Sequence, residues 1–237
     1  MGTPYLFNSN QLLDSLPDKE KNAFLADCEI VEMTFGEILT EPGEKVAYAF
    51  FPIDCLISLI ATLEGGNRLE VSMAGNEGMV GVSLILGSHT SSLQMLVQGA
   101  GQALCMSSAR FQAHLAKSPV IEQLMKRYLD VLMNQLAQSA ACAHFHELQA
   151  RLARWLLMTH DRTRGNQMHL THEFLSGMLG VRRAGVTHAA KALQNCGLID
   201  YQRGRITIQD RSGLEAAACL CYAVDCHIYV HMLEQTA

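Results

Sequence analysis

Basic and hydroxyl side chains recur at helical spacing in the C-terminal third of the chain. Arg183, Thr187 and Lys191 are each four residues apart, so one helix would present them on a single face with His188 beside them. Guanidinium and ammonium groups donate hydrogen bonds to phosphate, and arginine also fits the O6/N7 edge of guanine. The opposite face of this helix would be apolar and would pack inward, through Val186, Ala189, Ala190 and Leu193. The pattern is typical of a helix that binds a polyanion.

The residues around this helix predict a complete DNA-binding unit. Before it, Thr171 is a suitable N-cap for a helix whose inward side chains are Phe174, Leu175, Met178 and Leu179, and Gly180-Val181 supplies a tight turn. After Cys196-Gly197, residues 198–208 read as a β-hairpin with the basic tip Gln202-Arg203-Gly204-Arg205. These features together predict a winged helix-turn-helix. The predicted DNA-binding residues are Thr171, Arg182, Arg183, Thr187, His188, Lys191, Arg203 and Arg205.

The distribution of charge supports this interpretation, although the total charge does not. The 237-residue chain has a net charge of −5, which alone argues against a nucleic-acid partner. Residues 1–125 carry 6 basic and 14 acidic side chains, whereas residues 151–211 carry 10 basic and 4 acidic ones. The positive charge is therefore concentrated in the segment that contains the predicted helix-turn-helix.

The preceding half of the chain predicts a β-barrel. Residues 11–27 suggest a short helical entry interrupted at Pro17, and five strand-like segments follow between Gly-rich turns. These segments are Ile30–Phe35, Cys55–Leu63, Leu69–Met73, Leu93–Val97 and Gln102–Met106. Short strands at near-regular spacing predict a jelly-roll barrel, so the expected fold class is α+β.

A long helix is predicted between the barrel and the helix-turn-helix. Ser118-Pro119 is a good helix start, and a break near residues 144–147 would separate it from a second helix. A heptad-like seam runs along it through Ile121, Met125, Tyr128, Leu132, Leu136 and Ser139. This seam predicts either a dimerisation helix or a helix packed on its own barrel. The expected domains are 1–117, 118–146 and 147–237.

Barrel, long helix and winged helix-turn-helix occur in the order seen in the Crp/Fnr family of bacterial transcription regulators, which the chain resembles. The best matches are residues 35–44, which resemble the family's first barrel turn, and residues 170–199. The resemblance implies a cytoplasmic homodimer that binds double-stranded DNA at an inverted repeat, with RNA polymerase as a further partner. It places the family's base-reading arginine on Arg183, its acidic base contact on Ala184 and a later arginine on His188, while Arg182 stands where many members have Ser or Thr.

The barrel lacks the residues with which family members bind cyclic nucleotides. Gly81-Val82 stands where the resemblance expects Gly-Glu, and Ser91-Ser92 stands where it expects Arg-Ser. No Lys or Arg occurs from Leu69 through Ala109, and a buried phosphate needs such a partner. Gating by cyclic AMP is therefore not expected, although a module that binds another small molecule remains an alternative. A cupin-like metalloenzyme would carry a His-x-His motif on its barrel strands. The only such motif here, residues 144–146, lies outside the barrel, so an enzyme is not expected.

Cysteine and histidine cluster outside the predicted DNA-binding face. The candidate metal ligands are Cys142, His144, His146, Cys219, Cys221 and Cys226. Because their spacing matches no zinc motif, no cofactor is expected, and the main alternative is ordinary helix packing across Ala216–Tyr222. A redox- or metal-sensing regulator is the other alternative. The N-terminus has no signal-peptide pattern and the apolar stretches are short, so we expect reduced thiols and no membrane partner.

Overall fold

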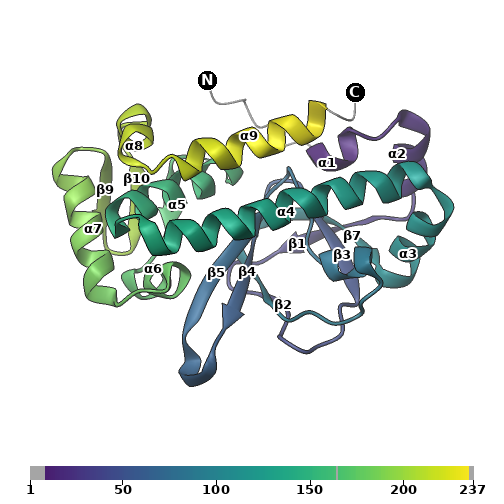
Figure 1. Ribbon diagram of the computed structural model, residues 1–237, viewed down its shortest axis with the longest axis horizontal. Helices are drawn as coiled ribbons and strands as arrows, with labels where there is room; N and C mark the ends of the chain where they lie inside the picture. Colours follow the sequence, from purple (N-terminus) through teal and green to yellow (C-terminus); the bar gives the residue numbers. More distant parts are fainter. Residues whose placement is uncertain (1–8, 164, 235–237) are drawn as a thin grey trace.

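The computed structural model describes residues 9–163 and 165–234, and within them two antiparallel sheets form the N-terminal barrel (Figure 1). One sheet has the order β1-β7-β3, with strands Glu29–Met33, Gly101–Ser107 and Tyr48–Pro52. The other has the order β2-β6-β4-β5, with strands Ile38–Thr40, Gln94–Gly99, Leu56–Thr62 and Arg68–Ala74. Short 3-10 turns, η1 (Glu64–Gly66) and η2 (Val82–Leu86), complete the connections. The predicted α+β fold class is confirmed, with β2 and β3 as additions to the predicted strands.

Apolar side chains from both sheets fill the barrel interior. Phe51, Ile57, Met79 and Val97 are fully buried in one continuous cluster. Helices α1 (Gln11–Asp14) and α2 (Asp18–Leu25) contribute Leu12, Leu13 and Phe24 to this cluster, and Pro17 separates the two helices as the sequence predicts. Helix α3 (Ser108–Lys117) follows the last barrel strand.

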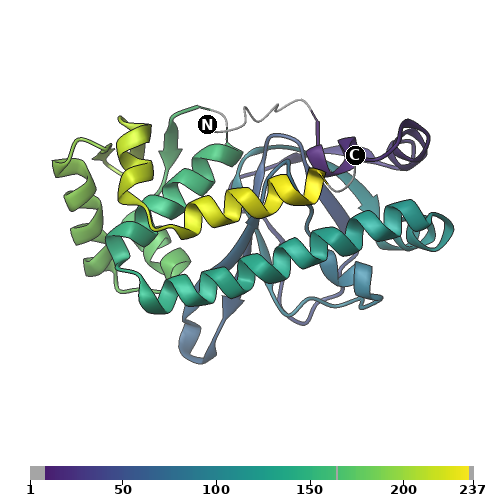
Figure 2. The ribbon, with the colours of Figure 1, turned by 45° about the horizontal axis from the view of Figure 1, so that its top comes forward.

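Helix α4 (Pro119–Phe145) runs the length of the molecule from the barrel to the C-terminal region (Figures 1 and 2). It begins as predicted, because the Ser118 side chain accepts a hydrogen bond from the backbone N–H of Ile121 at 3.4 Å and Pro119 occupies the first helical position. The break predicted at residues 144–147 is also present, since α5 (Leu148–Arg162) begins three residues after α4 ends.

The predicted seam on α4 lies mostly inside the protomer. Ile121, Met125, Tyr128 and Leu132 are buried in the barrel's own core, and the Tyr128 hydroxyl donates to the backbone oxygen of Met79 at 3.0 Å. These four side chains are therefore not available to a second subunit in this structure. A heptad-like apolar face needs only some apolar surface to cover it, and here the barrel supplies that surface. Leu136 and Ser139, the last two residues of the predicted seam, are half-buried.

Helix α5 joins the barrel to the winged helix. Its buried side chains share one core cluster with residues from the outer face of the β2-β6-β4-β5 sheet and with the helix-turn-helix. The contributing sheet residues are Leu56, Ile60, Met73 and Leu96. Helix α5 and the winged helix-turn-helix are thus packed directly on the barrel.

The C-terminal extension returns toward the barrel. Helix α8 (Arg211–Ala217) and helix α9 (Cys221–Glu234) are separated by residues 218–220, so the continuous packing expected across Ala216–Tyr222 is interrupted. The axes of α8 and of Cys221–Val230 differ by 107°, and α9 lies beside α4 (Figure 2). Tyr229 of α9 is buried in the barrel cluster. No Gly or Pro marks this break, so the local sequence did not predict it.

In the described part of the chain, no single helix is long and apolar enough to cross a membrane. Helix α8 and residues Cys221–Val230 together would be long and apolar enough, but the pair is bent between the two helices.

A buried ion pair holds α5 against the barrel. The Nε of Arg162 donates to Oε1 of Glu77 at 2.6 Å, and the two side chains are only 4% and 2% exposed. Arg162 also donates to the backbone oxygen of Met158 at 2.9 Å and lies 5.8 Å from the ring centre of Tyr229. One side chain therefore connects the turn after β5, the end of α5 and helix α9.

Replacing Arg162 with Met should lower the free energy of unfolding by about 3–5 kcal/mol, because it leaves the buried Glu77 carboxylate without its cation. The double variant Arg162→Met/Glu77→Gln should lose less, since no uncompensated charge remains. Urea denaturation measures both. Lys126→Met is the control, because its pair with Glu122 is exposed and should contribute under about 0.5 kcal/mol. Equal losses for Arg162→Met and Lys126→Met would contradict this role of the pair.

A second polar contact between barrel and α5 involves Glu70. Its carboxyl group accepts the indole N–H of Trp155 at 2.7 Å and contacts the Ser58 hydroxyl at 2.6 Å. The same hydroxyl contacts Oε1 of Gln98, yet it has only one proton to donate. Ser58 therefore donates to only one of these two oxygens at a time. Burial, the largest cause, raises the pKa of Glu70 to about 7, and the hydrogen bonds from Ser58 and Trp155 oppose this rise.

The pKa of Glu70 predicts a loss of stability as pH rises. Between its usual pKa and about 7, the folded state holds a proton that the unfolded state releases, so raising the pH from 5 to 8 should cost on the order of 1–3 kcal/mol. Glu70→Gln keeps an acceptor for Trp155 and should remove this contribution. Urea denaturation at several pH values, with the exposed Glu64→Gln as control, measures the difference from wild type. If Glu70→Gln and wild type showed the same pH dependence of stability, Glu70 would not be the group responsible.

Candidate nucleic-acid interface

The helix-turn-helix forms where the sequence predicts it. Helix α6 (His172–Leu179) begins at Thr171, whose hydroxyl accepts a hydrogen bond from the N–H of Phe174 at 3.1 Å. It ends at Gly180, whose φ of +63° favours glycine, and α7 (Arg183–Asn195) follows. All four residues predicted for the inward face of α7 are buried. The opposite face of α7 is consequently the exposed one.

The wing is a three-stranded sheet with the order β8-β10-β9. Strands β9 (Ile199–Gln202) and β10 (Arg205–Ile208) form the predicted hairpin, and β8 (Gln167–His169) is an addition. The tip residues Arg203 and Gly204 have φ values of 50° and 78°, as in the two-residue turns whose twist suits a hairpin. The N–H of Leu170 donates to the Gly204 oxygen at 2.7 Å, which fixes the tip next to the start of α6.

A groove of about 760 Å³ lies between α7, the wing and the first residues of α6. Its lining residues are Thr171, His172, Arg183, Thr187, Lys191, Gln194, Asn195, Tyr201, Arg203 and Gly204. Five of the eight predicted DNA-binding residues are therefore brought together in it. The other three, Arg182, His188 and Arg205, are exposed but do not line the groove.

His172 and Tyr201, which are not among the predicted DNA-binding residues, form one wall of the groove. Their rings are 4.5 Å apart between centres, and Nδ1 of His172 is 3.1 Å from the hydroxyl of Thr187. Burial, followed by the nearby Arg183 cation, lowers the pKa of His172, which favours a neutral imidazole at pH 7. Neither residue lies on the stripe of α7, so periodicity could not find them. Asn195 could have been found, because it continues the four-residue spacing after Lys191.

The structure divides the described basic residues of the 151–211 segment into two groups. Four arginines bond within the protein and do not line the groove: Arg151 to the Leu179 oxygen, Arg154 to Asp225, Arg162 to Glu77 and Arg211 to Asp161. The exposed cations of α7 and the wing are Arg182, Arg183, Lys191, Arg203 and Arg205. The charge count of the segment therefore overstates the charge available to a polyanion, although its location is as predicted.

Fold and groove together define a barrel protein with a C-terminal winged helix-turn-helix. Residues 150–217 match the Crp-like helix-turn-helix domain. A comparison with curated proteins finds no match.

Solved structures share this fold over most of the chain. A protein of Eubacterium rectale assigned to the crp/fnr family of transcriptional regulators has a TM-score of 0.69 at 17% identity, covering 87% of this chain and 96% of its own. FixK2 of Bradyrhizobium japonicum has a TM-score of 0.68 at 12% identity, with coverages of 81% and 98%. The c-di-GMP-responsive global regulator CLP of Xanthomonas campestris has a TM-score of 0.63 at 18% identity, with coverages of 81% and 99%.

The resemblance stated from the sequence is thus confirmed. The chain carries a Crp-like helix-turn-helix domain, and it has the fold of Crp/Fnr regulators.

Proposed function

We propose that the protein is a sequence-specific transcription regulator that binds an inverted repeat in DNA as a homodimer. The observation that carries this proposal is the groove in which cations of α7 and of the wing face one space. A helix face with Arg183, Thr187 and Lys191 has the dimensions and donors to enter a major groove. A regulator of this kind would act in the cytoplasm and would have RNA polymerase as a further partner.

We assign different tasks to the two cationic elements. Arg183 lies at the first turn of α7, where recognition helices contact base edges, and is proposed to read a guanine. Arg203 and Arg205 at the wing are proposed to contact phosphates, which add affinity without sequence information. The N-terminus of α6 at Thr171 would direct its free N–H groups at another phosphate.

We also propose that cyclic AMP does not gate this regulator. Supporting this, the chain has no Lys or Arg between Leu69 and Ala109 to neutralise a phosphate in the barrel. The described barrel interior is filled by apolar side chains. Any other effector would act by shifting the population of dimers that are competent to bind DNA.

Selection of DNA fragments from a random pool by the purified protein tests the function. The expected product is an inverted repeat with half-site centres about one helical turn, or roughly 34 Å, apart. Failure to enrich any repeat at modest salt would overturn the proposal.

The division of tasks predicts two different defects. Arg183→Ala should cost about 1–3 kcal/mol on the selected site and relax the preference at one base position. Arg205→Ala should weaken binding to all sequences and lower the salt slope by about one, because one phosphate contact is lost. Fluorescence anisotropy on selected and scrambled DNA at several salt concentrations measures both. Arg110→Ala, an exposed arginine of α3, is the control and should bind normally; equal losses on both DNAs for both variants would contradict the assignment.

The exposed face of α4 is the proposed dimer contact. Met133 is 58% exposed, and the exposed Ala137, Ala140 and Ala141 continue along the same side of the helix. Small side chains let a second helix approach closely, and Met133, Ala137 and Ala141 are not part of the barrel's core cluster. We therefore propose that this stripe, and not the buried residues of α4, forms the dimer seam.

Ala137→Glu should weaken dimerisation at least about tenfold, because an unpaired carboxylate would be buried between helices. DNA affinity for the inverted repeat should fall with it, whereas the fold of the protomer should be unchanged. Sedimentation equilibrium and anisotropy measure these effects. Ala113→Glu, at an exposed position of α3, is the matched control. A variant that stays as dimeric as the control would exclude this face.

A further inference from the structure

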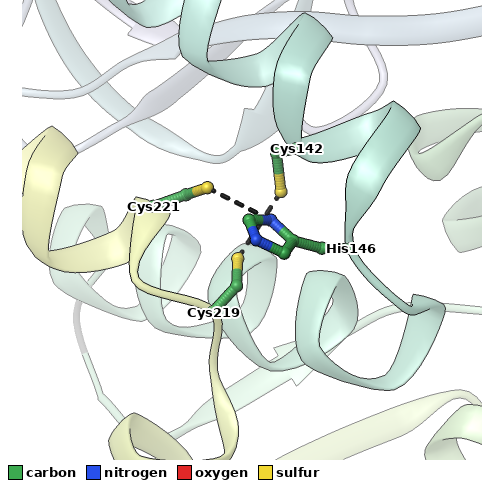
Figure 3. Close-up of side chains that lie close together, drawn as sticks. All are labelled: Cys142, His146, Cys219 and Cys221. Atoms are coloured by element: carbon green, nitrogen blue, oxygen red, sulfur yellow. Dashed lines mark hydrogen bonds between the residues drawn. The ribbon is translucent and has the colours of Figure 1, made fainter.

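Three cysteines and one histidine from two distant segments converge at the elbow between α4 and α5 (Figure 3). Cys142 and His146 lie at the C-terminal end of α4, where His146 is the C-cap residue. Cys219 lies in the break between α8 and α9, and Cys221 is the first residue of α9, about 75 residues further along the chain. Sequence spacing alone could not predict this group, because the turn that brings the two pairs together is not marked by Gly or Pro.

The four ligand atoms are as close as a shared ion requires. The sulfurs of Cys142 and Cys219 are 3.5 Å apart, and the sulfur of Cys221 is 3.4 Å from Nδ1 of His146. All four atoms lie within 4.8 Å of one another. A tetrahedral zinc ion, with Zn–S of about 2.3 Å and Zn–N of about 2.0–2.1 Å, places its ligand atoms roughly 3.6–3.8 Å apart. The Cys142–Cys219 and Cys221–His146 separations are slightly shorter than this, and pairs at separations of up to 4.8 Å would close around a bound ion.

Ordinary packing of apolar residues does not explain this arrangement. Cys142 and Cys221 are buried, but Cys219 is half-buried and His146 is exposed, and His146 nevertheless directs its ring nitrogen at the sulfurs (Figure 3). Nε2 of Gln138 donates to the sulfur of Cys221 at 2.8 Å. Such a donor to a ligand sulfur is typical of the surroundings of metal sites.

Two candidates from the sequence lie outside the group. The His144 ring packs edge-on against Phe145, with centres 4.6 Å apart, and Cys226 lies further along α9. Neither is among the four atoms that converge. Both residues therefore serve as matched controls for their neighbours.

We propose that Cys142, His146, Cys219 and Cys221 form a structural zinc site. Three thiolates and one imidazole constitute a closed tetrahedral ligand set that leaves no open position for catalysis. The ion would join the end of α4 to the start of α9, next to the elbow that leads into the winged helix. Zinc would thus hold α9 along α4 and restrict the angle between barrel and helix-turn-helix. This proposed site is independent of whether the protein binds DNA.

The metal content of the full-length protein tests the proposal. Protein purified without chelators and with a reductant should contain one zinc ion per chain by plasma mass spectrometry. His146→Ala and Cys219→Ser should each lose most of it, whereas His144→Ala and Cys226→Ser should retain it. Zinc added to metal-free protein should raise the thermal midpoint of wild type and of the two controls, but not of the two ligand variants.

A readout that depends on ligand type completes the test. Cobalt(II) added to metal-free protein should give the visible absorption and sulfur-to-metal charge transfer of a tetrahedral thiolate site. Because His146 is exposed, His146→Ala should fold normally, which circular dichroism checks. Equal metal content in all four variants would overturn the site. A disulfide between Cys142 and Cys219 in the reduced preparation, or stoichiometric iron in place of zinc, would overturn the assignment as well.

Discussion

The contact between Arg162 and Glu77 is the constraint on which the arrangement of the molecule depends. Neither charge is tolerated alone in the interior, so the end of α5 and the turn after β5 must stay together. The same guanidinium lies against Tyr229 and therefore also positions α9. The pair does not simply add stability, since a buried ion pair loses hydration on both partners. Positions of α5 that separate the two groups are disfavoured, because each would leave a buried charge without a partner.

The position of the groove between α7 and the wing follows from the position of α5. Helices α6 and α7 share a core with α5 and with the outer face of the β2-β6-β4-β5 sheet, so the apolar side of the helix-turn-helix is fixed toward the barrel. The cations of α7 and of the wing consequently point away from the barrel. Arginines close to one another in sequence thus have different tasks. Arg162 is used inside the protein, while Arg183 and Arg203 face the groove.

Local patterns predicted the parts of the fold whose physical causes are local. The capped start of α4, the interruption at Pro17, the turn at Gly180 and the tip of the wing each depend on a residue type that suits one backbone conformation. Other elements have weaker local signals. Strand β3 is an edge strand that ends in Pro52, and β8 has only three residues, so their pairing partners decide that they are strands. The heptad-like spacing correctly predicts an apolar face on α4, but this face packs against the barrel of the same protomer.

The sequence by itself determined the order of barrel, long helix and winged helix-turn-helix. It also determined the inward face of α7 and the stripe of Arg183, Thr187 and Lys191, because helical periodicity depends on near neighbours. Only the tertiary structure decided which arginines are buried, that His172 and Tyr201 line the groove, and that α9 returns to α4. It also decided that Cys142 and His146 meet Cys219 and Cys221. Contacts between residues so far apart follow from the packing of whole elements, and no local spacing encodes them.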